Sequence, residues 1–234
     1  MSQSNGYVIG FAVAMTVICG GLLALANQGL KEKQVEQKTL DTQKQILSAV
    51  IAITETTDVT TIYANQINSY VVSTDGKKVD GVVAEKVNTK KVYKQKDVSL
   101  KQLPVFEYKN EEGKVEAYIV PMFGKGLWDD VWGYVALETD LITIKGASFG
   151  HKGETPGLGA RITEVQDRFK GKKIMNASGK LASVSFIKGE GTATNLSDNE
   201  VDGLSGATMT TKGVNSMLSN YFGYYDNYFK TIRN

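Results

Sequence analysis

A group of small hydroxyl residues near the C-terminus is the part of the sequence best suited to chemistry. Residues 202–214 read DGLSGATMTTKGV and place Ser205, Thr208, Thr210 and Thr211 in front of an aromatic-rich segment. If a helix starts here, Ser205 or Thr208 can cap its first N–H groups. The same N–H groups and the helix dipole favour a phosphate, and small residues let a ligand approach the backbone. The residues alone leave both interpretations open: a plain helix cap or an anion site.

A second glycine-rich stretch covers residues 153–162, GETPGLGARI. Its Pro-Gly pair predicts a tight turn, and the glycine after the leucine permits another close approach to the backbone. The only histidine, His151, stands just before it without an evident partner, so no nucleophile–base pair is predicted. The residues of this stretch that could contact a polar ring are Glu154, Thr155, Pro156, Gly157, Leu158 and Gly159.

The third stretch is residues 123–134, FGKGLWDDVWGY. Trp128 lies beside glycines, where it can either stack on a planar ligand or pack in the core. Together the three loops suit a cofactor that has a phosphate at one end and a flat ring at the other. Neither a GxGxxG fingerprint nor a GxxxxGK[ST] phosphate loop is present.

The composition excludes several functional classes. With a net charge of +2 and only three arginines among 27 basic residues, the chain has no strong basic field, so nucleic acid is not an expected partner. One cysteine and one histidine cannot form a zinc site, and a single cysteine excludes an internal disulfide. We therefore predict no metal centre held by this chain.

The N-terminus contains a charge-free, mainly apolar run of 20 residues, 7–26. Such a helix spans about 30 Å, the thickness of the hydrocarbon core. A buried soluble helix and a cleaved signal peptide are the alternatives; no lysine or arginine precedes the run, which favours a retained anchor. We predict an anchor over residues 1–30 and a soluble domain over 31–234. The lysines that follow the span would place that domain in the cytoplasm by the positive-inside rule.

For the soluble part we predict a single α+β domain, with a mostly antiparallel sheet and helices packed against it. Helical spacing of apolar residues covers 32–53 and 59–70, and a long amphipathic helix with an aromatic face begins at Val214. Between them lie alternating, β-branched runs with turn signals at Asp75-Gly76 and Glu112-Gly113. Two more strands are expected between residues 130 and 149, and one within 181–188.

These motifs resemble the FMN-binding domain family of ion-pumping redox complexes, and within it the C subunit of the sodium-translocating NADH:quinone oxidoreductase. The resemblance runs along essentially the whole chain and is carried by the N-terminal span and by GKGLWDDVWGYVALETDL, GETPGLG and SGATMTTKGV. ETPGLG and SGAT also resemble the G subunit of the related Rnf-type complex. The GKGLW segment and the direct run into a final helix favour the sodium pump.

The resemblance implies that FMN is joined by a phosphoester bond to the last hydroxyl residue of the SGAT motif, Thr208. A separate magnesium-dependent flavin transferase would install it from FAD. Glu154 to Gly159 would lie along the isoalloxazine, with Trp128 nearby, and Thr210 would neighbour the phosphate. Arg161, just after ETPGLG, is more basic than the family pattern. The motif that the transferase reads would be Asp202, Gly203, Ser205, Gly206, Ala207 and Thr208.

The implied function is electron relay. Electrons would arrive from an iron–sulfur centre in the membrane and leave towards the flavin of the B subunit, while quinone is reduced elsewhere and sodium is exported. No NADH or quinone site is predicted in this chain, so no turnover is expected from it alone. The implied partners are the other subunits of the complex, the flavin transferase and membrane lipid.

The family keeps this domain on the periplasmic face of the bacterial inner membrane, against the positive-inside rule, and we adopt the family's placement. Two alternatives remain open on the sequence: the G subunit of an Rnf-type ferredoxin-linked complex, and a flavin-free anchored scaffold or binding domain.

Overall fold

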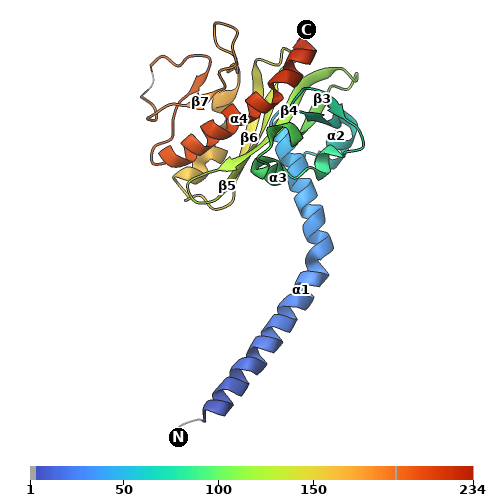
Figure 1. Ribbon diagram of the computed structural model, residues 1–234, viewed down its shortest axis with the longest axis vertical. Coiled ribbons are helices and arrows are strands. Elements are labelled where there is room, and N and C mark those ends of the chain that lie inside the picture. The colour runs from blue at the N-terminus through green and yellow to red at the C-terminus, as the bar shows by residue number, and fades with distance from the viewer. Residues whose placement is uncertain (1–3, 193, 234) are drawn as a thin grey trace. The chain divides into compact units, whose positions relative to one another are not determined.

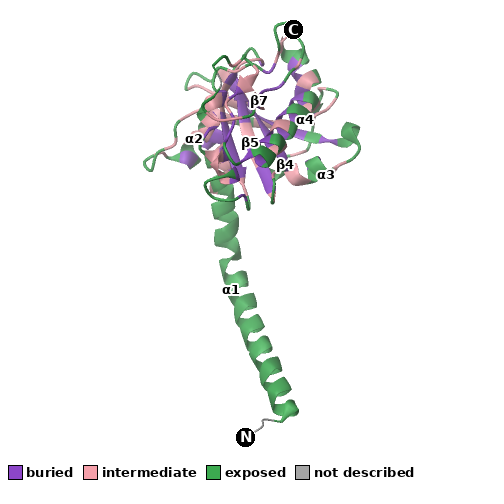
Figure 2. Cartoon of the chain, turned by 90° about the vertical axis from the view of Figure 1, so that its left-hand side faces the viewer, coloured by how far each residue is buried: buried purple, intermediate pink, exposed green. Residues whose placement is uncertain are grey.

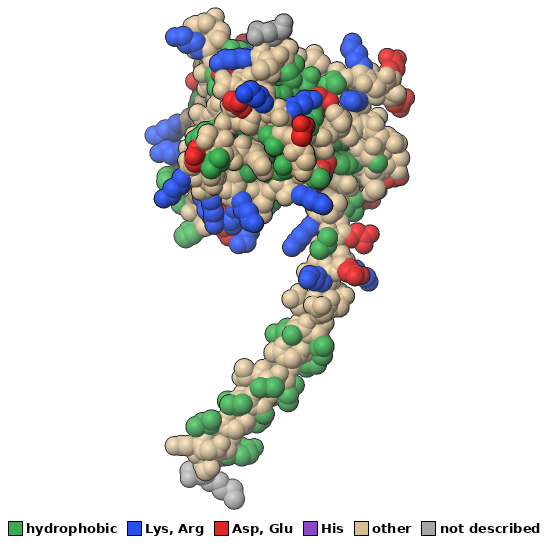
Figure 3. Space-filling model, turned by 45° about the vertical axis from the view of Figure 1, so that its right-hand side comes forward, with side chains coloured by type: hydrophobic (Ala, Val, Ile, Leu, Met, Phe, Trp, Pro, Cys, Tyr) green, Lys and Arg blue, Asp and Glu red, His purple; other side chains and the backbone are tan. Residues whose placement is uncertain are grey.

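The computed structural model describes residues 4–192 and 194–233, and the chain divides into two compact units, Met1–Thr42 and Gln43–Asn234. The first unit consists of the helix α1, which begins at Asn5 and continues into the second unit as far as Ser48. It is long and apolar enough to cross a membrane. Figure 3 shows hydrophobic side chains along it, and charged ones only towards its C-terminal end. The first charge is Lys31, so the apolar run predicted from the sequence is one continuous helix with the polar turns that follow it.

The second unit is built on a six-stranded sheet in the order β2-β1-β3-β4-β5-β6, with every neighbouring pair antiparallel. Turns at Gly76 and Gly113, both with positive φ, close the β1–β2 and β3–β4 hairpins at the two predicted positions. Positive φ favours glycine, which explains both turn signals. The strands are β1 (Ile67–Ser73), β2 (Lys78–Val79), β3 (Gln102–Lys109), β4 (Val115–Lys125), β5 (Asp130–Leu137) and β6 (Ile144–His151).

Short helices and a small second sheet surround these strands. β7 and β8 pair in parallel, in contrast to the main sheet. The elements are α2 (Val59–Gln66), η1 (Ala84–Lys86), α3 (Thr89–Lys94), η2 (Val98–Leu100), η3 (Gly159–Thr163), η4 (Gln166–Phe169), β7 (Ser185–Phe186) and β8 (Glu200–Val201).

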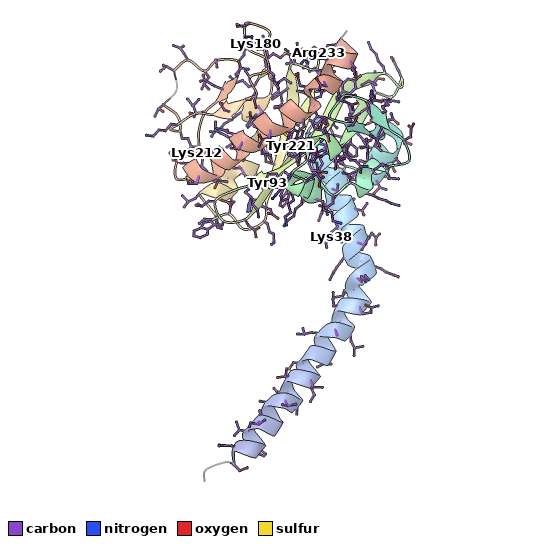
Figure 4. All side chains as sticks on the ribbon, viewed as in Figure 1. Lys38, Tyr93, Lys180, Lys212, Tyr221 and Arg233 are labelled. Atoms are coloured by element: carbon purple, nitrogen blue, oxygen red, sulfur yellow. The ribbon has the colours of Figure 1, made fainter. Side chains whose placement is uncertain are left out.

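The C-terminal helix α4, Thr208–Arg233, lies across one face of the sheet, chiefly on β4 (Figure 1). Its aromatic face is core: Tyr221, Phe222, Tyr225 and Phe229 are at most 1% exposed. Figure 4 places Tyr221 midway along the helix, between Lys212 near its start and Arg233 near its end. The buried parts of this unit in Figure 2 are mainly the strands and the helix face turned to them. This packing fixes α4 and therefore fixes the position of its first turn.

The prediction of an α+β domain with an N-terminal apolar helix is confirmed, but three helix boundaries were wrong. The predicted helix over residues 32–53 ends at Ser48. The predicted helix over residues 59–70 ends at Gln66, because the β-branched residues that follow pair with β3. The predicted aromatic helix starts at Thr208 instead of Val214. The three threonines expected in front of the helix therefore lie in its first turn, and Ser205 precedes it.

Candidate functional site

A cleft of about 170 Å³ lies where the loop after β6 meets the first turn of α4. The structure thus brings together two motifs that stand about 50 residues apart in the sequence. The residues that line the cleft are Leu127, Glu154, Thr155, Leu158, Gly159, Gly206, Ala207, Thr208, Met209 and Thr210.

A buried carboxylate forms the inner end of this cleft. Glu154 is 4% exposed. Its Oε1 accepts hydrogen bonds from the N–H groups of Trp128 at 2.9 Å and Asp129 at 3.3 Å, and its Oε2 accepts one from the Thr210 hydroxyl at 2.5 Å. Burial alone would raise the pKa of this carboxyl, but these donors outweigh burial and lower it. Glu154 is therefore an ionised group that joins three segments of the chain.

Two glycines let the walls of the cleft come close together. A Cβ on Gly159 would lie 2.6 Å from Glu154 Oε2, so no other residue fits there without moving the carboxylate. Gly206 has φ +74° and faces the Leu158 side chain, so it meets both the conformational and the steric requirement for glycine. At both glycines the space is taken up by side chains of this chain, and the predicted approach of a ligand to the backbone stays a prediction.

The first turn of α4 lacks side-chain caps. Within the described residues, the N–H groups of Thr208, Met209 and Thr210 have no hydrogen-bond acceptor. The sequence offered Ser205 or Thr208 as the cap, but neither side chain caps the helix. The residue before the helix, Ala207, has no polar side chain. Three unpaired N–H groups at a helix start provide a favourable setting for an anion.

The three threonines of this turn differ in what their hydroxyls do. Thr210 donates to Glu154, and Thr211 donates to the carbonyls of Ala207 at 3.2 Å and Thr208 at 3.1 Å. Thr208 is exposed, and its hydroxyl makes no hydrogen bond within the part of the chain that the structure describes. Thr208 is thus the threonine whose oxygen is available at the mouth of the cleft.

Other sequence-predicted residues lie at or beyond the edge of the cleft. Trp128 is 71% exposed, and it is its backbone N–H, not its ring, that contacts the site. Pro156, Gly157 and Ser205 form the adjoining turns and are also exposed. His151, which had no evident partner in the sequence, ends β6, and its Nδ1 accepts the Glu154 N–H at 3.3 Å.

Sequence reasoning missed two kinds of residue. Leu127 and Met209 line the cleft with half-exposed side chains, and their positions next to Trp128 and Thr208 were the available signal. Glu190 also went unnoticed. It pairs with Arg161 at 2.7 Å and Arg168 at 3.2 Å, outside the set of residues that line the cleft, and nothing in the sequence spacing indicates these contacts.

The cleft falls inside a region with known relatives, because residues 126–222 match the family model of the FMN-binding domain. The chain is 35% identical to the C subunit of the Na(+)-translocating NADH-quinone reductase of Haemophilus ducreyi, over 90% of this chain and 87% of that protein. It is 36% identical to the protein of the same name from Neisseria meningitidis serogroup A, with the same coverage. This chain belongs to the family of Na(+)-translocating NADH-quinone reductase C subunits.

Solved structures agree with this assignment. The crystal structure of the C subunit from Parabacteroides distasonis matches with a TM-score of 0.75 and 35% identity, over 86% of this chain and 96% of that one. The NqrC structure from Shewanella oneidensis gives a TM-score of 0.74 at 26% identity, over 85% and 99%. Because the FMN-binding match includes every residue that lines the cleft, FMN is the cofactor to test against this geometry.

The geometry of the cleft suits FMN. The unpaired N–H groups of the first turn of α4 can receive the phosphate. Leu127, Leu158 and Met209 offer apolar surface to a flat ring, and each is between 43% and 54% exposed. Polar N–H groups and apolar side chains therefore line the same cleft.

Proposed function

We propose that this chain is the FMN-carrying electron-relay subunit of a sodium-translocating NADH:quinone reductase, with FMN bound by a phosphoester to Thr208. The observation that carries the attachment site is the state of the three threonine hydroxyls in the first turn of α4. Those of Thr210 and Thr211 are engaged within the fold, whereas that of Thr208 is exposed and unpaired among the described residues.

The electrostatics of the turn support the same site. A phosphodiester at Thr208 would place its negative charge beside the N–H groups of residues 208–210 and at the positive end of the α4 dipole. The ionised Glu154 keeps its negative charge, which three uncharged hydrogen-bond donors stabilise on the inner side of the cleft. Asp202, Gly203, Ser205, Gly206 and Ala207 precede Thr208 as the segment that a flavin transferase would recognise.

FMN, when bound, supplies the electron-transfer chemistry, and the chain's residues position it and tune its potential. We infer from the family resemblance that electrons come from a membrane iron–sulfur centre and go to the flavin of the B subunit. No separate NADH or quinone site is proposed for this chain. α1 would anchor it in the bacterial inner membrane, with residues 43–234 on the periplasmic side and the other subunits as partners. The matched FMN-binding domain favours this function over a flavin-free scaffold.

The attachment site is tested by intact mass. The full chain, co-expressed with a flavin transferase, should gain the mass of FMN less one water and show flavin fluorescence in a denaturing gel. Thr208→Ala should abolish both signals, Thr208→Ser should retain them, and Thr211→Ala should leave them unchanged. Retention of the added mass by Thr208→Ala, with Thr210 or Thr211 carrying it, would refute the assignment.

A further inference from the structure

A carboxylate outside the cleft links the cleft's two walls. Glu190 lies in the loop between β7 and β8, and both of its oxygens accept hydrogen bonds. Arg161 donates to it through Nη1 at 3.0 Å and Nη2 at 2.7 Å, and Arg168 donates through Nη2 at 3.2 Å. The Ser205 N–H donates at 2.9 Å. Four donors from three separate segments therefore converge on one carboxylate.

The donors belong to opposite sides of the cleft. Arg161 lies in η3, two residues beyond the wall residue Gly159. Ser205 opens the turn that carries Thr208 into α4. Inside the cleft the same two walls meet at the bond between Thr210 and Glu154. Glu190 therefore provides a second connection between the two walls, independent of the bond between Thr210 and Glu154. Two connections resist a hinge motion of the walls that a single connection would allow.

Arg168 extends this link to the backbone in front of the turn. Its Nη1 donates to the carbonyls of Asp202 at 3.1 Å and Gly203 at 2.8 Å. The Asp202 carboxylate in turn accepts the Gly191 N–H at 2.6 Å, which ties the turn back to the loop of Glu190. A Cβ on Gly203 would collide with backbone carbonyls of that same loop. The segment before Thr208 is thus held on several sides.

The cluster joins two arginines to one carboxylate and is partly shielded from water. The side chains of Arg161, Arg168 and Glu190 are 28%, 29% and 19% exposed. The Arg161 guanidinium lowers the pKa of Glu190 to about 2, with further help from the Ser205 N–H and from Arg168. Glu190 is therefore ionised at neutral pH. A forked, partly buried arrangement of this kind is more specific in geometry than an exposed pair.

We propose that Glu190 is a positioning residue for FMN attachment, which holds η3 and the 203–207 turn at the separation that presents the Thr208 hydroxyl. This role rests on the proposed attachment at Thr208. Glu190 itself does not touch the cleft; it acts through Ser205 on one wall and through Arg161 on the other.

The first test needs no flavin. The full chain in detergent, produced without a transferase, is compared with Glu190→Gln by hydrogen–deuterium exchange. Exchange in the peptides over residues 159–164 and 203–208 should rise about tenfold, because the amide keeps only one acceptor oxygen and turns an NH2 group towards N–H donors that the second carboxylate oxygen accepts. The matched control is Asp198→Asn, which removes the exposed pair with Lys173 at 2.9 Å and should leave both peptides unchanged.

The second test measures attachment. With transferase, FAD and Mg²⁺, the initial rate at which Glu190→Gln gains the FMN mass should fall about tenfold, whereas Asp198→Asn keeps the wild-type rate. If Glu190→Gln unfolds, as judged by tryptophan fluorescence, Arg161→Lys replaces it, because it keeps the positive charge and loses the fork.

Unchanged exchange in the two peptides, or an unchanged attachment rate, would overturn the role of Glu190. If the wild-type chain gains no flavin mass, the proposed function fails instead, and the exchange experiment still decides whether Glu190 joins the two walls.

Discussion

Replacing the buried carboxylate of the cleft, Glu154→Gln, tests the proposed electrostatics most directly. The wild-type side chain accepts three hydrogen bonds as an anion, from Trp128, Asp129 and Thr210. Charge-assisted bonds contribute about 1.5–3 kcal/mol and neutral ones about 0.5–1.5 kcal/mol, so a neutral amide of the same shape loses about 1 kcal/mol per bond. We expect the free energy of unfolding to fall by about 2–3 kcal/mol at pH 7.

The direction of the Glu154 pKa shift determines how the stability difference should change with pH. The pKa of Glu154 is lower in the folded protein than its ordinary value of 4.5, because its donors outweigh burial. The stabilisation by the carboxylate is therefore fully present above pH 4.5 and is lost as the pH falls through the lower, folded-state pKa. The difference in unfolding free energy between wild type and Glu154→Gln should be largest near neutral pH and shrink in acid.

The assay is urea unfolding of the full chain in detergent, followed by tryptophan fluorescence. Both tryptophans, Trp128 and Trp132, lie in the unit of residues 43–234, so the signal reports on that unit. Glu200→Gln is the control. Like Glu154, Glu200 is a hydrogen-bonded carboxylate, but its two bonds come from one residue, Ser197, at an exposed site. This control should leave the free energy of unfolding nearly unchanged. Equal stability of Glu154→Gln and wild type at pH 7, or a difference that persists at low pH, would refute the reasoning.

Two further predictions use other parts of the chain. Gly223 lies on the exposed side of α4 with open space around it, so Gly223→Ala should stabilise the domain by about 0.5–1 kcal/mol in the same assay. Gly213→Ala, in the same helix, should destabilise it by about 1–3 kcal/mol, because its Cβ would lie 3.0 Å from the carbonyl carbon of Lys125; equal effects at the two sites would contradict the packing. If the domain is periplasmic, a cysteine introduced by Ser178→Cys in a Cys19→Ser background should react with a membrane-impermeant maleimide in intact cells, and protection until lysis would place it in the cytoplasm.

The parts of the fold that follow from local patterns were predictable. The apolar N-terminal run, the turns at Gly76 and Gly113 and the aromatic face of α4 each follow from period and turn chemistry within one segment. The end of α2 was not predictable in this way. Residues 67–70 satisfy a helical pattern as well as a strand pattern, and the choice is made by pairing with β3, which lies more than 30 residues away in the sequence.

The residues of the site also fall into those that the local sequence indicates and those that depend on contacts with distant segments. The hydroxyl-rich turn and the ETPGLG loop could be named as a candidate site from small residues and glycines that are contiguous in the sequence, whereas the choice of Thr208 came from the family resemblance. Glu190 could not, because its role comes from three donor residues in other segments, and a single glutamate in a glycine-rich loop has no distinctive spacing. Nor could the sequence tell which of the threonines is free, since that depends on Glu154 reaching Thr210 across the cleft.

The start of α4 shows why the hydroxyl residues are not redundant. A helix with alanine at the position before its first turn forgoes a cap that contributes about 1 kcal/mol, and here three N–H groups stay unpaired among the described residues. Thr210 and Thr211 do not compensate, because their hydroxyls bond to Glu154 and to carbonyls. An anion bound at Thr208 would satisfy these N–H groups and recover that stability. Attachment of FMN should therefore stabilise the domain as well as equip it for electron transfer, and the flavinylated chain should unfold at higher urea than the flavin-free chain.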